Sequence, residues 1–118
     1  MRNEFSTKFN FHLLTMANPD GYNYSRTVDN DWRKNRRPRG TRCPNGEEAV
    51  GVDLNRNFDD KWGLTGASDD PCDRYTYMGH KPGSEAETQA IEKYLKSLPE
   101  TPILGFVWFQ FCNQPHVN

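Results

Sequence analysis

The chain has 118 residues, of which 34% are hydrophobic and 13% aromatic, and its 15 basic and 16 acidic side chains leave a net charge of -1. This near-neutral balance gives no general attraction to nucleic acid or membranes, and no apolar run is long enough to span a bilayer. The aromatic content argues against intrinsic disorder, whereas a mean hydropathy of -0.98 is low for a complete core. We therefore expect an ordered, loop-rich piece of a larger α/β core.

The first predicted element is a strand over residues 9–16. Its apolar residues alternate at first and then become continuous, a pattern typical of a strand buried in a mostly parallel sheet. Asn18, Pro19, Asp20 and Gly21 follow, and these residue types predict a turn that ends the strand.

Residues 22–45 carry no sustained hydrophobic period and are rich in Arg, Asn and Pro. We expect an ordered loop here, with one helical turn near residues 29–32. A loop of this length in a compact domain is usually functional.

Residues 51–58 concentrate polar groups: Asp53, Asn55, Arg56 and Asn57 lie within eight positions. An acid flanked by single apolar residues predicts a short strand that opens into a loop, because Asp, Asn and Arg favour neither helix nor strand interiors. A guanidinium beside two amides suits a carboxylate or phosphate ligand. The segment therefore predicts an anion-recognition loop, and the alternative is a polar surface turn.

The clearest predicted helix covers residues 85–98. Ser84 as N-cap with Glu87 three positions later forms a capping-box pattern. An apolar stripe at helical spacing predicts a buried face, formed by Ala90, Ile91, Tyr94, Leu95 and Leu98. A second buried strand is expected over residues 103–109. The order strand, long loop, helix, strand predicts an α/β fold with its functional loops at one edge of the sheet.

Three cysteines, Cys43, Cys72 and Cys112, lack the paired spacing of a structural zinc site. One disulfide with a leftover thiol is one interpretation, and three buried free thiols in a reducing compartment is the other. The connectivity cannot be derived from these spacings.

Several motifs in series resemble the zinc metallocarboxypeptidases of the carboxypeptidase A/B type, over residues 9–98. The motifs are Asn18-Pro19-Asp20-Gly21-Tyr22, Trp32-Arg33-Lys34-Asn35-Arg36, residues 51–58, Gly66-Ala67-Ser68 with Pro71-Cys72, and Gly83-Ser84-Glu85-Ala86-Glu87. The resemblance implies a mixed twisted sheet flanked by helices. It also implies that the complete domain removes single C-terminal residues from peptides with one zinc ion and a zinc-activated water. This chain would supply the middle of that peptidase domain, without the upstream zinc-ligand segment and the downstream catalytic segment.

The resemblance also implies roles for individual residues. Arg33 matches the arginine that polarises the scissile carbonyl and stabilises the oxyanion, a task suited to a fixed guanidinium. Asn55 and Arg56 match the pair that grips the terminal carboxylate of the substrate. Asp53 matches the acid that orients a zinc-bound histidine.

The same resemblance pairs Cys43 with Cys72 as the family disulfide. Family members are secreted, so an extracellular location is implied, although residues 1–8 are too polar to begin a signal peptide. The implied partner is a peptide or protein with a free C-terminus, with no nucleic acid and no membrane.

The zinc ligands depart from the family pattern. The first two come from a His-x-x-Glu motif, but none of His12, His80 and His116 has a glutamate three residues on. The position that aligns best with the third ligand holds Gln110, and His116 is the other candidate. Because catalytic zinc needs three protein ligands, we expect these 118 residues alone neither to bind zinc tightly nor to cleave peptides.

Two further functions remain open. The chain could bind peptide C-termini without catalysis, using Arg33, Asn55 and Arg56 without a metal. Alternatively, the basic run over residues 33–42 could bind a nucleic acid or another polyanion, although the near-neutral net charge weighs against this.

Overall fold

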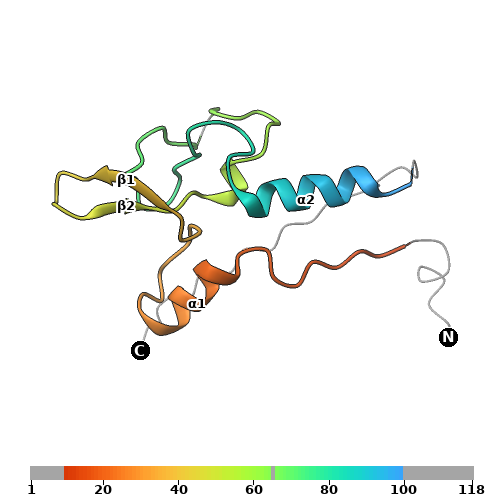
Figure 1. Cartoon of the computed structure of the whole chain (residues 1–118), viewed down its shortest axis with the longest axis horizontal. Coiled ribbons are helices and arrows are strands. Elements are labelled where there is room, and N and C mark those ends of the chain that lie inside the picture. Colours follow the sequence, from red (N-terminus) through yellow and green to blue (C-terminus); the bar gives the residue numbers. More distant parts are fainter. Residues whose placement is uncertain (1–9, 65, 100–118) are drawn as a thin grey trace.

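The computed structural model describes residues 10–64 and 66–99. The elements in chain order are helix α1 (Pro19–Thr27), strands β1 (Pro38–Arg42) and β2 (Glu48–Val50), the short 3-10 helix η2 (Leu54–Arg56) and helix α2 (Ala86–Ser97). Figure 1 shows the hairpin and α2 on one side of the molecule, with α1 and the segment before it on the other. No helix in the described ranges is long and apolar enough to cross a membrane.

The strand predicted over residues 9–16 is wrong for the part that the structure describes. Residues 10–16 have no regular structure, and the side chains of Phe11, Leu13 and Leu14 are 70%, 87% and 62% exposed. The physical reason is that an apolar run becomes a strand only when neighbouring strands satisfy its backbone groups. Among the described residues, no strand pairs with this segment.

Helix α1 begins where a turn was predicted. The Asn18 side chain accepts a hydrogen bond from the Gly21 backbone N–H at 3.0 Å, and Pro19 occupies the first helical turn. Asn at the N-cap and Pro just after it are helix-starting residues as well as turn residues. The helix continues to Thr27, so it occupies part of the segment predicted as loop.

The β1–β2 hairpin also lies partly in that predicted loop. The two strands pair antiparallel, with Pro38 opposite Val50 and Arg42 opposite Glu48. One helical turn was predicted near residues 29–32, and the structure has a hydrogen-bonded turn there, closed by a 3.0 Å bond from the Trp32 N–H to the Asp29 carbonyl, but no helix. The rest of the loop prediction failed because a short hairpin of polar residues leaves no hydrophobic alternation to detect.

Helix α2 confirms the predicted helix to within one residue at each end, but its N-terminus differs. Glu85 is the N-cap and makes no side-chain capping bond, so the predicted capping box is wrong. Within the predicted stripe, Ile91 is buried, Tyr94 is 51% exposed and Ala90 is also exposed. The strand expected over residues 103–109, together with Cys112, lies outside the described residues.

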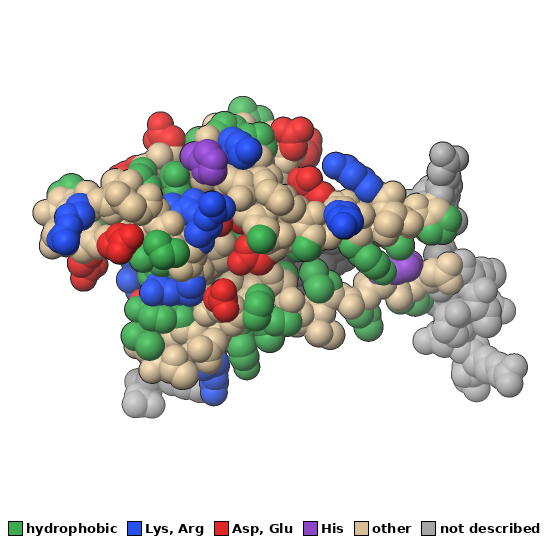
Figure 2. All heavy atoms as spheres, viewed as in Figure 1, with side chains coloured by type: hydrophobic (Ala, Val, Ile, Leu, Met, Phe, Trp, Pro, Cys, Tyr) green, Lys and Arg blue, Asp and Glu red, His purple; other side chains and the backbone are tan. Residues whose placement is uncertain are grey.

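The centre of the described structure is more polar than apolar. Its buried hydrophobic side chains are Ala49, Val52, Leu54, Tyr77 and Ile91. Its buried polar ones are Lys34, Asn35, Asp53, Asn57, Ser84, Glu85 and Thr88. Hydrophobic side chains are also spread over the surface face seen in Figure 2. Since buried polar groups must be hydrogen-bonded to be tolerated, the order of this region depends on a polar network.

Candidate functional site

The site loop, residues 51–58, leaves β2 by a turn that requires glycine. Gly51 has φ of 81°, and a Cβ on this residue would lie 2.2 Å from the Asn35 carbonyl oxygen. The Gly51 N–H donates to the Arg37 carbonyl at 2.8 Å. The observed strand β2 ends at Val50, so the short strand predicted within residues 51–58 does not form; the Asp53 backbone is extended and the loop enters η2 at Leu54.

Asp53 is the buried centre of the site loop. Its side chain is fully inaccessible, and its Oδ2 accepts bonds from Arg33 Nε at 3.0 Å and Arg33 Nη2 at 2.8 Å. Its Oδ1 accepts a bond from the Asn55 backbone N–H at 3.1 Å, which caps η2. One carboxylate therefore joins two of the residues singled out from the sequence.

Arg56 and Asn55 lie at the outer side of the loop. Asn55 is exposed and Arg56 is half-buried. Arg56 Nε donates to the Gly66 carbonyl at 2.8 Å, and Arg56 Nη1 lies 3.4 Å from the Asn55 carbonyl. The Nε bond restrains the guanidinium plane of Arg56.

A frame of three residues, Asn35, Asn57 and Glu85, supports the loop from beneath. All three are at most 1% exposed. Asn57 Nδ2 donates to Ser84 Oγ at 2.9 Å and to the Met78 carbonyl at 2.8 Å, while its Oδ1 accepts from the Glu85 N–H at 3.1 Å. Asn57 thereby ties the end of the site loop to the start of α2.

Asn35 connects the beginning of the site loop to the Glu85 carboxylate. Asn35 and Val52 exchange bonds, from the Asn35 N–H to the Val52 carbonyl at 3.0 Å and from the Val52 N–H to Asn35 Oδ1 at 2.8 Å. Asn35 Nδ2 donates to Glu85 Oε2 at 2.8 Å. None of the frame residues was predicted as functional from the sequence. The signal in the sequence that could have indicated them was the frequency of Asn and Glu within the motifs listed above.

Glu85 is charged although it is buried. Burial alone raises the pKa of the Glu85 carboxyl, but hydrogen bonds from Asn35 and Ser84, with the charges of Arg39 and Arg37, outweigh it and hold the pKa below its ordinary value. Arg39 Nη1 lies 3.2 Å from Glu85 Oε1, and its side chain is only 7% exposed.

The basic run over residues 33–42 is mostly engaged inside the protein. Arg33 pairs with Asp53, and the Arg36 guanidinium lies 3.5 Å from the Tyr24 ring centre and 4.4 Å from that of Trp32. Buried Lys34 donates from Nζ to the Asp73 carbonyl at 2.5 Å. Burial lowers the pKa of the Lys34 amine, against the raising effect of nearby Asp73.

The described residues do not form a metal centre. Within residues 10–64 and 66–99, no three His, Cys, Asp or Glu side chains cluster closely enough to hold a metal ion. His12 Nδ1 lies 2.7 Å from the Tyr94 hydroxyl, and His80 lines a hollow of about 320 Å³ beside β1. Gln110 and His116 lie outside the described residues.

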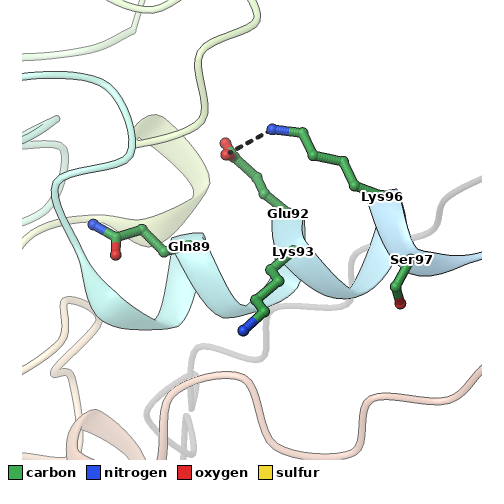
Figure 3. A pocket seen from close by; sticks show the side chains of 5 residues that line it. All are labelled: Gln89, Glu92, Lys93, Lys96 and Ser97. Atoms are coloured by element: carbon green, nitrogen blue, oxygen red, sulfur yellow. Dashed lines mark ion pairs between the residues drawn. The ribbon is translucent and has the colours of Figure 1, made fainter.

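Another hollow, of about 360 Å³, lies on α2. Figure 3 shows the side chains that line it, and an ion pair joins Glu92 to Lys96 there at 3.8 Å. No residue of the site loop lines either hollow. The candidate site is therefore defined by the hydrogen bonds around Asp53.

Comparison with known proteins decides the family, because the family model for zinc carboxypeptidases matches residues 2–114. The chain belongs to the zinc carboxypeptidase family. It is 40% identical to carboxypeptidase B of Bos taurus over 94 residues, which are 80% of this chain and 21% of that protein. It is 46% identical to carboxypeptidase A2 of Rattus norvegicus over 85 residues, 72% of this chain and 19% of that protein. The chain thus spans about a fifth of the length of these carboxypeptidases.

Solved carboxypeptidase structures confirm the fold class. Bovine thrombin-activatable fibrinolysis inhibitor, in complex with tick carboxypeptidase inhibitor, matches with a TM-score of 0.59 and 40% identity over 68% of this chain and 25% of that one. Carboxypeptidase A from Helicoverpa armigera matches with a TM-score of 0.59 and 41% identity over 70% and 19%. The helices and small antiparallel sheet described above are therefore an α/β part of the carboxypeptidase fold, and the complete family domain uses zinc.

The disulfide between Cys43 and Cys72 is present. It joins the end of the β1–β2 hairpin to the segment that precedes α2, across a sequence separation of 29. Of the two interpretations of the cysteines, the bridge is therefore the one that the structure contains.

Proposed function

We propose that this chain is the carboxylate-binding and oxyanion-stabilising part of a metallocarboxypeptidase domain that hydrolyses C-terminal residues from peptides. Asn55 and Arg56 grip the terminal carboxylate of the substrate, and Arg33 faces the scissile carbonyl. The observation that carries the proposal is the buried Asp53 carboxylate, which holds the Arg33 side chain on one oxygen and the Asn55 backbone on the other.

The polar groups of the site loop suit the free carboxylate at the C-terminus of a peptide. A carboxylate accepts two parallel N–H bonds from a guanidinium, and such charge-assisted bonds are roughly twice as strong as neutral ones. Arg56 is restrained through its Nε while the exposed Asn55 amide lies next to it in the chain. An internal peptide bond has no negative charge for Arg56 to bind, so this arrangement favours an exopeptidase.

Arg33 suits the developing charge of the reaction. A guanidinium that is already fixed by Asp53 stabilises an oxyanion with little reorganisation. Zinc would come from the complete domain, because the described part of the chain lacks a cluster of ligands for it.

We propose further that the 118 residues alone are catalytically inactive and that the protein works outside the cell, as its Cys43–Cys72 disulfide favours. Hydrolysis of an N-blocked dipeptide with added zinc tests the first point. We expect no turnover, and turnover abolished by a chelator would contradict it.

Carboxylate recognition is tested with an acetylated dipeptide as the free acid and as the amide, followed by NMR titration of the chain. We expect the acid to bind and to shift the amide signals of the site loop, and the amide to bind at least tenfold more weakly. Arg56→Gln should weaken binding of the acid about tenfold, since a charge-assisted bond contributes about 1.5–3 kcal/mol.

Arg42→Gln is the matched control, because Arg42 lies on the hairpin and donates to the Gly46 carbonyl. It should leave the affinity unchanged. Equal binding of acid and amide would refute the proposal. Binding of DNA that weakens steeply with salt would instead favour a polyanion ligand.

A further inference from the structure

The two oxygens of Asp53 serve different parts of the site. Oδ2 takes two N–H groups of Arg33, and Oδ1 takes the backbone N–H of Asn55. The Asp53 carboxylate is fully buried, so water does not compete for these bonds. In addition to the role that resemblance implies, orienting a zinc-bound histidine, the described contacts place Arg33 and the Asn55 backbone against this carboxylate.

The geometry of the Arg33 pair leaves donors for a ligand. Nε and Nη2 point at Asp53, and Nη1 has no hydrogen-bond partner among the described residues. The Arg33 side chain is 18% exposed, whereas that of Asp53 is fully buried. Two bonds that converge on one oxygen restrain the guanidinium plane, which a single bond does not do.

We propose that Asp53 is a positioning residue that aims Arg33 and the Asn55 end of the site loop at the same substrate. This inference rests on the proposed function. An asparagine at this position has one acceptor oxygen in place of two, so it can hold either Arg33 or the Asn55 N–H and cannot hold both.

The test compares Asp53→Asn with the wild-type chain by two measurements. The first is the exchange rate of the Arg33 Nε–H with water, followed by NMR, with the Arg36 Nε–H as internal reference because Arg36 stacks on Tyr24 and Trp32. The second is the affinity for the acetylated dipeptide acid. We expect at least tenfold faster exchange at Arg33, no change at Arg36 and an affinity about tenfold weaker.

Asp29→Asn is the matched control, because it removes a carboxylate from an exposed pair with Arg74 at 2.9 Å. It should change neither measurement. If Asp53→Asn does not fold, Arg33→Lys replaces it, since lysine keeps the charge but cannot make the two-bond contact. It should weaken binding of the acid about as much as Asp53→Asn, and unchanged affinity in a folded variant would overturn the inference.

The two proposals fail in different ways. If the wild-type chain does not prefer the acid, the proposed function fails, and the positioning role still stands or falls on the exchange of the Arg33 Nε–H. If the wild type prefers the acid while Asp53→Asn leaves both affinity and exchange unchanged, the positioning role fails and the proposed function stands.

Discussion

Replacing Glu85 by glutamine removes one buried negative charge with little change in side-chain shape. The carboxylate accepts bonds from Asn35 and Ser84 at 2.8 Å each and pairs with Arg39 at 3.2 Å. Because the Arg39 side chain is only 7% exposed, the substitution leaves a nearly buried cation without its partner. Such a loss costs about 3–5 kcal/mol, out of a total stability of roughly 5–15 kcal/mol for a domain.

We expect a loss of about 3 kcal/mol for Glu85→Gln, at the lower end of that range because glutamine keeps one acceptor oxygen. Urea unfolding followed by tryptophan fluorescence measures it. Glu92→Gln is the matched control, since Glu92 pairs with an 80% exposed Lys96 at 3.8 Å, and an exposed pair contributes about 0.2–1 kcal/mol. Equal losses in the two variants would refute the role given to Glu85.

The pH dependence checks the same reasoning. The pKa of Glu85 in the folded chain lies below its ordinary value of 4.5, so the folded state favours the charged form. The stability from this group is fully present above pH 4.5 and is lost as pH falls through the folded pKa. The stability difference between wild type and Glu85→Gln should therefore shrink in acid, and a constant difference would contradict this assignment.

The remaining predictions concern the backbone and the disulfide. Gly51→Ala should destabilise the chain more than Gly40→Ala, because both glycines have positive φ but only a Cβ at Gly51 meets the Asn35 carbonyl, at 2.2 Å; equal urea midpoints would be the contrary result. Replacing Cys43 and Cys72 together by serine should cost roughly 3–4 kcal/mol in the loop-entropy relation for a separation of 29. Thermal unfolding measures that cost, and a loss below about 1 kcal/mol would show that the bridge constrains little.

Local sequence patterns predicted the elements whose signals are periodic and missed those whose signals are not. Helix α2 was found because its apolar positions recur at helical spacing over three turns. Helix α1 was missed because Asn18 and Pro19 begin helices and turns alike, and its interior is polar. Residues 10–16 carry a strand pattern, but a strand also needs partners that no local pattern supplies.

The candidate site shows the same limit. Resemblance supplied Arg33, Asp53, Asn55 and Arg56 as candidates, and the structure brings the first three together around one carboxylate. The frame beneath them was missed because its contacts join residues that are distant in sequence. Asn35 and Glu85 are 50 positions apart, and an isolated Asn or Glu gives no sign of such a partner.

The polar network around the site loop and the apolar residues 10–16 differ in how far the described part of the chain satisfies them. The site loop is held by bonds from Asn35, Asn57 and Asp53, all of them made within the described residues. Phe11 and Leu13, in contrast, expose 70% and 87% of their surface. Since a bonded polar loop keeps its geometry wherever its partners stay in place, the site loop should keep its shape independently of residues 10–16. Arg33 is therefore positioned by the described part of the chain itself, through Asp53, while burial of the apolar side chains of residues 10–16 would need additional protein surface.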